Sequence, residues 1–166
     1  MCLFTLQDKP FVAEENIVCY KCVDITKCGI FYSPVIGRNI PDDVISGKRL
    51  YRAKGIFRRA HIHKYYPWLH EVGKGWIHTC TSSPVYYVSA PQIWFECVIP
   101  KGTKYWKSED GEEYASRSIR FVKPCEGQIR ALYADCIGGA RLPTEEELSG
   151  IVGSLERTKE FFKKFA

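Results

Sequence analysis

The chain has 166 residues, of which 45% are hydrophobic and 26% charged, and its net charge is +5 at pH 7. Such a chain is long enough to bury a core without disulfides or metals, and its composition excludes a disordered or low-complexity protein. We expect a single domain over residues 1–166, β-rich from 16 to 123 and helical from 126 to 165.

The first residues lack the charge and apolar pattern of a signal peptide, and no run approaches the roughly 20 apolar residues of a membrane helix. We therefore predict a cytoplasmic protein without a membrane partner. In the cytoplasm the eight cysteines are expected to be reduced, buried thiols.

Cys19 and Cys22 have a zinc-like spacing, and His61 and His63 are candidate partners for them. Residues 16–25, however, are rich in β-branched and aromatic side chains and predict a strand. In a strand, positions three apart point to opposite faces. We therefore predict neither a metal site nor a cofactor.

Glycine, proline and aspartate recur so often between residues 29 and 47 that this stretch predicts a long loop. Further along, hydrophobic alternation and turn residues predict a series of antiparallel strands. The expected strands cover residues 49–56, 76–81, 93–99, 104–107 and 116–122, with turns at 100–103 and 110–111.

The pattern changes near the C-terminus. Apolar residues from Ile129 to Cys136 follow the i, i+3, i+4, i+7 spacing of an amphipathic helix, with a strand as the alternative. Thr144 and Glu147 form a capping box, which begins a helix whose apolar stripe reaches Phe165. The sequence thus predicts an α+β fold, with an antiparallel β-meander core and a long C-terminal amphipathic helix.

The segment Lys48–Trp76 holds eight Lys and Arg residues and a single acid, Glu71, so it carries +7 and the rest of the chain −2. Six aromatic rings lie in the same segment. Cations neutralise phosphates, and rings stack on bases with roughly 1–3 kcal/mol per base. The pattern predicts that the chain binds a phosphate-containing small molecule, such as a nucleotide, without catalysis.

After Trp76, the polar residues of the 76–81 strand and the following hydroxyl groups can hydrogen-bond a ribose or phosphate. The predicted ligand-binding residues are Arg52, Arg58, Arg59, Lys64, Tyr65, Tyr66, Trp68, Trp76, His78 and Thr81. Single-stranded nucleic acid is an alternative ligand. In the opposite interpretation, the rings belong to the core and the cations to a solvated face.

Two further functions compete with simple binding. In an enzyme acting on nucleotides or NAD, Glu96 would be the catalytic carboxylate and His78 or Thr81 would position a ribose. In a protein-interaction module, the aromatic surface would dock another protein. A homo-oligomer that builds its pocket between symmetric copies is compatible with each function.

Residues 96–122, ECVIPKGTKYW…EYASRSIRFV, with the earlier CYK, YSP and GWIHT segments, resemble uncharacterised proteins of gut Bacteroidales and their phages. The resemblance implies a compact phage or mobile-element protein in the host cytoplasm. Sequestering a host nucleotide signal would then be a natural role.

Two fainter resemblances concern shorter phrases. The chain has a first strand with Lys21, then Thr79-Cys80-Thr81-Ser82, and then Glu96 before PKGT. This order is similar to that of the ADP-ribosyltransferases, which bind NAD in a split sheet. The arginine-type members carry Arg, Ser-Thr-Ser and Glu-x-Glu at these places, so this chain departs from their motif. Residues 140–148, ARLPTEEEL, are similar to a phrase of formylglycine-generating-enzyme-like and C-type-lectin-like domains.

Overall fold

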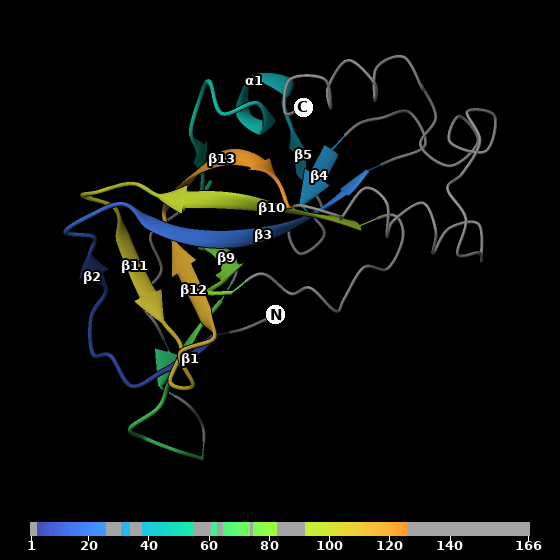
Figure 1. Ribbon diagram of the computed structural model, residues 1–166. Helices are drawn as coiled ribbons and strands as arrows, with labels where there is room; N and C mark the ends of the chain where they lie inside the picture. The colour runs from blue at the N-terminus through green and yellow to red at the C-terminus, as the bar shows by residue number, and fades with distance from the viewer. Residues whose placement is uncertain are drawn as a thin grey trace.

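The computed structural model describes residues 3–25, 31–33, 38–54, 61–62, 65–73, 75–82 and 92–125. These residues form thirteen strands and one short helix (Figure 1). In chain order the elements are β1 (Leu3–Thr5), β2 (Phe11–Val12), β3 (Ile17–Ile25), β4 (Phe31–Ser33), β5 (Arg38–Ile40), α1 (Asp42–Ile45), β6 (Tyr51–Arg52), β7 (His61–Ile62), β8 (His70–Val72), β9 (Ile77–Cys80), β10 (Gln92–Ile99), β11 (Lys104–Lys107), β12 (Glu113–Ser116) and β13 (Ser118–Pro124).

The predicted α+β class is wrong, because the regular structure of the described residues consists almost entirely of antiparallel strands. Its only helix, α1, has four residues. The predicted C-terminal helices fall on residues 126–166, which lie outside the described residues. The described residues of the main core come almost all from strands and from α1.

The strands form two sheets. The larger sheet has ten strands in the order β2-β11-β12-β9-β3-β10-β13-β6, and β4 and β5 continue from β3. The smaller sheet has the order β1-β8-β7. All pairs are antiparallel, and the longest pairing joins β3 to β10, from Ile17 opposite Ile99 to Asp24 opposite Gln92.

The β-meander prediction is wrong in its pairing, although the turn at 100–103 is confirmed. Gly102 has a φ of 86°, and Thr103 donates its N–H to the Pro100 carbonyl at 3.1 Å. Both residues also bond the Ala13 backbone, at 2.7 and 2.9 Å. These bonds direct the chain toward β2, so β11 pairs with β2 and β12 instead of with β10.

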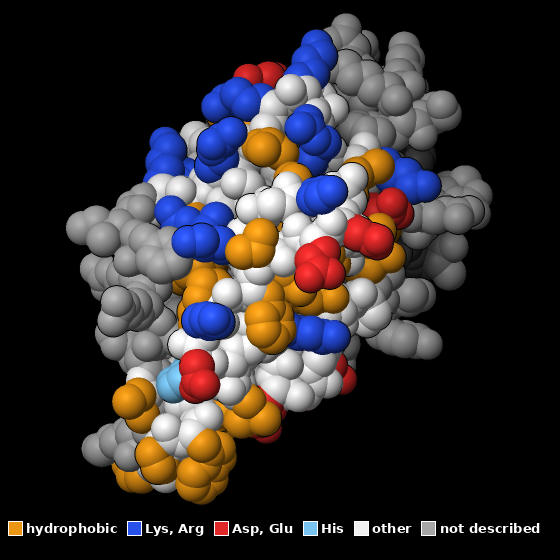
Figure 2. Space-filling model, turned by 90° about the vertical axis from the view of Figure 1, so that its left-hand side faces the viewer, with side chains coloured by type: hydrophobic (Ala, Val, Ile, Leu, Met, Phe, Trp, Pro, Cys, Tyr) orange, Lys and Arg blue, Asp and Glu red, His pale blue; other side chains and the backbone are white. Residues whose placement is uncertain are grey.

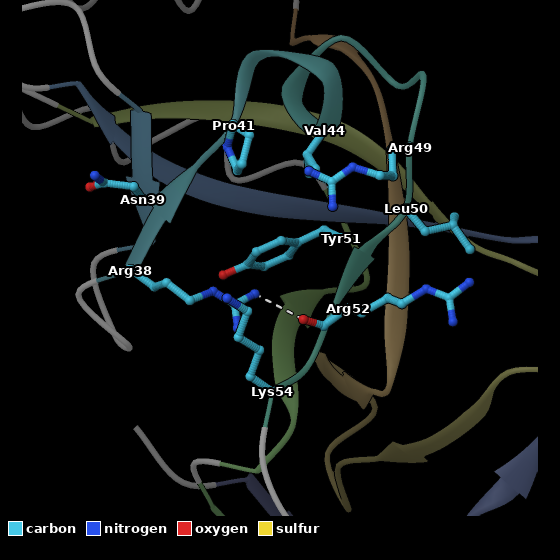
Figure 3. A pocket seen from close by; sticks show the side chains of 9 residues that line it. All are labelled: Arg38, Asn39, Pro41, Val44, Arg49, Leu50, Tyr51, Arg52 and Lys54. Atoms are coloured by element: carbon cyan, nitrogen blue, oxygen red, sulfur yellow. Dashed lines mark hydrogen bonds between the residues drawn. The ribbon is translucent and has the colours of Figure 1, made fainter.

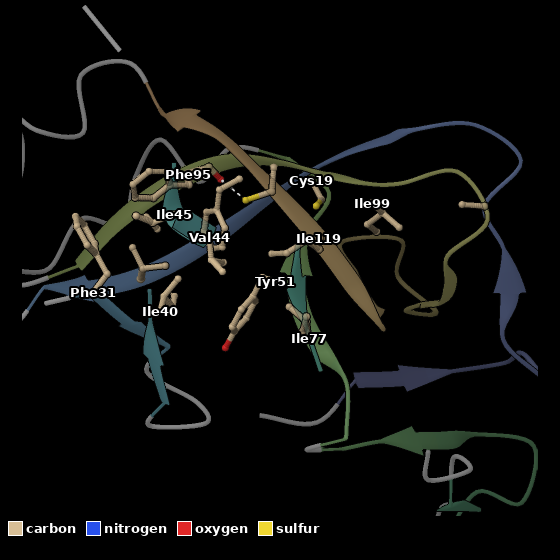
Figure 4. Packing of buried hydrophobic residues seen from close by; sticks show 14 residues of the cluster. Cys19, Phe31, Ile40, Val44, Ile45, Tyr51, Ile77, Phe95, Ile99 and Ile119 are labelled. Atoms are coloured by element: carbon tan, nitrogen blue, oxygen red, sulfur yellow. Dashed lines mark hydrogen bonds between the residues drawn. The ribbon is translucent and has the colours of Figure 1, made fainter. Parts of the chain in front are cut away.

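The main core lies on the inner face of β3, β10 and β13 (Figure 4). Every second residue points inward, so that Cys19 of β3 lies opposite Cys97 of β10, and Cys97 opposite Phe121 of β13. The rings of Phe95 and Phe121 pack edge to face, with centroids 5.5 Å apart. Other core members, from β4, β5, α1 and β6, are Phe31, Ile40, Val44, Ile45 and Tyr51.

Where the sequence predicts a long loop, the structure has β4, β5 and α1. Pro41 adopts an extended conformation just before the helix, and the acids Asp42 and Asp43 occupy its first turn. Proline and acids are favourable at a helix N-terminus, so these residues begin a helix that buries Val44 and Ile45. The same residues also occur in turns, which explains the error.

A second core cluster joins the two sheets. Leu3 of β1 and Val72 of β8 pack with Trp76, just before β9, and with Trp106 and Ala115 of the larger sheet, all at most 2% exposed. The rings of Trp76 and Trp106 meet edge to face, with centroids 5.9 Å apart. This contact fixes the small sheet at the lower end of the molecule in Figure 1, away from α1 and β5.

Candidate functional site

The structure divides the predicted binding residues among three places. Arg52 lines a pocket beside α1, three aromatic residues lie on the β7–β8 hairpin, and Trp76 and His78 are buried. Thr81 follows β9 and donates its backbone N–H to Glu112 at 2.9 Å. Arg58, Arg59 and Lys64 lie outside the described residues. The described part of the predicted set thus does not form one site.

The pocket is a cavity of about 310 Å³ between β5, α1 and β6 (Figure 3). Its volume lies at the lower end of the roughly 300–1,000 Å³ typical of small-molecule sites. We call it the basic pocket, and its lining residues are Arg38, Asn39, Pro41, Val44, Arg49, Leu50, Tyr51, Arg52 and Lys54.

The basic pocket has a strongly positive lining. Four of its nine described lining residues are Arg or Lys, and none of the nine is Asp, Glu, His or Cys. The nearby acid Asp43 holds Arg49 in a two-bond contact, Nε to Oδ2 at 2.7 Å and Nη2 to Oδ1 at 3.1 Å. This hydrogen bond lowers the pKa of Asp43. Since both side chains are largely exposed, the pair is screened by solvent and leaves the pocket cationic.

Arg38 is held in position by two contacts. It donates from Nη2 to the Arg52 carbonyl at 2.8 Å, and its guanidinium carbon lies 4.7 Å from the centroid of the Tyr51 ring. Cation–π contact of this kind fixes the plane of a guanidinium group. Because only one terminal nitrogen of Arg38 bonds to a described residue, its other N–H groups can donate to a ligand.

Tyr51 lies across the middle of the pocket in Figure 3, with its hydroxyl directed toward the side occupied by Arg38. The residue is 2% exposed, and its ring also packs on Phe121, with centroids 6.0 Å apart. Among the described residues, the Tyr51 hydroxyl is one of four buried polar side-chain groups without a hydrogen-bond partner, and the only one of these that lines this pocket. Such groups are rare in native proteins, since burial without a partner is costly.

The connection from α1 to β6 depends on Gly47. Its φ is +80°, and a Cβ atom there would lie 2.5 Å from the Phe121 carbonyl oxygen. The Gly47 carbonyl accepts a hydrogen bond from Arg120 Nη1 at 2.7 Å. These contacts join the connection to β13 and position Arg49 and Tyr51 at the pocket.

The predicted aromatic residues are far from this pocket along the molecule. Tyr65, Tyr66 and Trp68 follow β7 and are 72%, 50% and 64% exposed, and Ile62 is 67% exposed. We call these four residues the aromatic tip. In Figure 2, hydrophobic side chains gather at the lower tip, whereas Lys and Arg side chains are spread over the upper part. An exposed apolar group of this kind is what the alternative prediction of an interaction module requires.

Trp76 and His78 belong to the interior. Trp76 is 1% exposed, and the guanidinium carbon of Arg117 lies 5.5 Å from its ring centroid. His78 Nε2 lies 3.1 Å from the Gly73 carbonyl oxygen, and burial lowers the pKa of the imidazole. A neutral imidazole that donates to a carbonyl fixes the end of β8 against β9. Neither ring is open to a ligand in this structure.

Glu96, the predicted catalytic acid of the enzyme alternative, lies on the outer face of β10. It is directly opposite Tyr20 of β3 on one side and Lys123 of β13 on the other. Burial, and then the charge of Glu96, raise the pKa of Tyr20. No hydrogen bond or ion pair joins Glu96 to His78 in the part of the chain that the structure describes.

Lys21 is a buried cation that sequence reasoning used only in a resemblance. It lies on the inner face of β3 between Cys19 and Val23 and is 4% exposed. Burial lowers the pKa of its amine and raises that of the Cys19 thiol to about 12. A thiol with so high a pKa is a weak nucleophile at neutral pH.

Within the described ranges, no three His, Cys, Asp or Glu side chains are placed to hold a metal ion. The described helix is also too short to cross a membrane. Cys19 and Cys22 have different surroundings, because Cys19 points into the core and Cys22 toward the half-buried outer face.

Sequence reasoning missed Arg38 and Asn39 and chose Arg52 while passing over Arg49, Tyr51 and Lys54. The last three belong to the basic segment, where Arg49 and Tyr51 alternate with Leu50, Arg52 and Lys54 in the pattern of a strand. Arg38 lies outside that segment, and only the β4–β5 pairing brings it to Tyr51.

No protein-family model matches the chain, and neither a curated protein nor a solved structure matches it. The family resemblances therefore stay predictions. The function has to be inferred from the chemistry of the basic pocket.

Proposed function

We propose that the protein binds a phosphate-bearing small molecule, such as a nucleotide, in the basic pocket and does not transform it. The observation that carries the proposal is that the described lining residues include four cations and no carboxylate. Guanidinium groups form charge-assisted, often bidentate hydrogen bonds with phosphate oxygens, and these are stronger than neutral hydrogen bonds.

The lining also supports binding without turnover. General acid–base catalysis needs a group that gains or loses a proton near neutral pH, and covalent catalysis needs an activated nucleophile. Among the described residues, no His, Cys, Asp or Glu lines the pocket. Arginine and lysine can hold a phosphate there, and release of the unchanged ligand would suit the sequestration of a nucleotide signal.

Reversing the charge of two lining residues tests the proposal. Arg52 and Lys54 are exposed, so the double variant Arg52→Glu/Lys54→Glu should keep the melting temperature of the wild type. Its pocket lining loses its net charge, and affinity for ATP measured by calorimetry should fall at least about tenfold. Chromatography after incubation should recover wild-type ligand intact.

The matched control is Lys9→Glu/Lys101→Glu, which changes the net charge equally with two exposed lysines outside the basic pocket. This control should bind ATP like the wild type at the same ionic strength. Equal loss of affinity in both double variants would indicate a general charge effect and overturn the pocket assignment. Altered ATP would instead favour the enzyme alternative.

A further inference from the structure

The faces of the Tyr51 ring are not available for stacking. Arg38 lies 4.7 Å from the ring centroid, and the Phe121 ring packs at 6.0 Å. With 2% exposure, Tyr51 has almost no ring surface open to the cavity, and Figure 3 shows its hydroxyl directed toward the side of the pocket where Arg38 lies. A nucleobase therefore cannot use this ring as a platform, although base stacking normally requires an open aromatic face.

The rest of the basic pocket is equally poor in groups that read a base. Its other lining residues are four cations, Asn39 and the aliphatic residues Pro41, Val44 and Leu50. No other aromatic residue in the described part of the chain lines it. The exposed rings of Tyr65, Tyr66 and Trp68 belong to the hairpin at the other end of Figure 1.

The groups that read a phosphate are, by contrast, already positioned. Arg38 is fixed by the Arg52 carbonyl and by Tyr51, and Arg49 is fixed by two hydrogen bonds to Asp43. Each guanidinium group keeps further N–H donors beyond those used in these contacts. Donors held before binding lose less side-chain entropy when the ligand arrives.

The Tyr51 hydroxyl completes this set. It is buried, lines the cavity and has no hydrogen-bond partner among the described residues. A phosphate oxygen is a strong acceptor and would satisfy the O–H group. Beside the four cations of the lining, this hydroxyl is a neutral donor that can fix the orientation of the phosphate.

Resting on the proposed function, we infer that the pocket recognises the phosphate groups of its ligand and not the base, with the Tyr51 hydroxyl donating to a phosphate oxygen. The ligand class is then a polyphosphate or phosphomonoester. Nucleotides with equal numbers of phosphates bind alike whatever their base, and affinity rises with phosphate number because more charge enters a cationic site.

Calorimetry with the full chain at constant ionic strength tests the inference, using ATP, GTP, CTP, AMP, adenosine and inorganic tripolyphosphate as probes. The three nucleoside triphosphates should agree within about threefold, and tripolyphosphate should bind in the same range. AMP should bind more weakly and adenosine should not bind. These measurements use the wild-type protein and do not depend on a variant that folds.

Tyr51→Phe keeps the ring and removes only the hydroxyl. It should weaken all three triphosphates by the same factor, about tenfold, because a hydrogen bond to a charged acceptor is lost. Its melting temperature should not fall, since the buried hydroxyl has no described partner. Tyr105→Phe, which alters a partly buried tyrosine outside the basic pocket, is the control and should bind like the wild type.

The outcomes separate the two levels of the proposal. If no phosphate compound binds, the proposed function itself fails. If ATP binds but tripolyphosphate does not, or if the bases differ more than about thirtyfold, the pocket binds nucleotides and base-independent recognition is wrong. If Tyr51→Phe binds all probes like the wild type, the role of the hydroxyl is wrong.

Discussion

The basic pocket and the aromatic tip differ in how their side chains are held. In the pocket, Arg38 is stacked on Tyr51, Arg49 is paired with Asp43, and the connection that carries Arg49 is joined to β13 through Gly47. At the tip, the side chains project into solvent with half or more of their surface exposed. The pocket thus resembles a preorganised binding site, whereas the tip has the exposure of a contact surface.

Both regions include residues of the segment Lys48–Trp76, in which cations and rings alternate. β6 carries its first part to β13 in the large sheet, and β7 and β8 carry its second part to β1 in the small sheet. The two parts therefore reach different ends of the molecule. The cations and rings that lie close together in the sequence of this segment are therefore not close together in the folded protein.

The largest expected effect is a difference in stability between removal of the buried Trp76 ring and removal of the exposed Trp68 ring. Trp76→Ala should lower the free energy of unfolding by about 3–5 kcal/mol, because it removes a large buried side chain from the contact between the sheets. Trp68→Ala should change it by less than about 0.5 kcal/mol, since that side chain is 64% exposed. Urea denaturation measures both, and similar losses would mean that the tip is part of the core.

A smaller effect is expected at Gly47, which supports the basic pocket but not the tip. A non-glycine residue in a left-handed backbone conformation costs about 1–3 kcal/mol of stability. Gly47→Ala should lower the free energy of unfolding by more than this, because the new Cβ would also clash with the Phe121 carbonyl oxygen. The matched control Gly102→Ala has a similar φ of +86° but nothing within 4 Å of its Cβ. Denaturation should show the larger loss for Gly47→Ala, and calorimetry should show weaker ATP binding for that variant alone.

Local sequence patterns predicted the features that depend on near neighbours. The turn at 100–103 and a strand at 76–81, observed as β9, follow from glycine conformation and from alternation. The burial of Tyr51 beside the exposed Arg52 also obeys the alternation predicted for residues 49–56. These features need no knowledge of which strand lies next to which.

The features that the sequence did not predict depend on contacts between residues far apart in the chain. β11 leaves β10 because Gly102 and Thr103 bond to Ala13, almost ninety residues earlier in the chain. Arg38 reaches Tyr51 only through β4 and β5, which were predicted as loop. Trp68 and Trp76 share the same aromatic and basic segment, so their opposite exposures follow from the position of the small sheet and not from the residues beside them.

The smallest expected effect concerns Asp43, the acid beside the basic pocket. Asp43→Asn removes a negative charge next to Arg49 while keeping an oxygen that can accept one of its hydrogen bonds. Because both partners are largely exposed, the melting temperature at neutral pH should hardly change. Affinity for ATP should rise roughly threefold, since less negative charge opposes the phosphates.

The sign of the pH dependence follows from the lowered pKa of Asp43 in the folded state. The carboxylate is charged above its unfolded-state pKa, and whatever stability the pair contributes is lost as the pH falls through the folded-state value. The wild-type and Asp43→Asn proteins should therefore converge in ATP affinity in that acidic range. Asp8→Asn, which removes an exposed acid outside the basic pocket, should leave affinity unchanged. If Asp43→Asn weakens ATP binding instead, Asp43 acts by orienting Arg49, and the pocket depends on that orientation more than on its net charge.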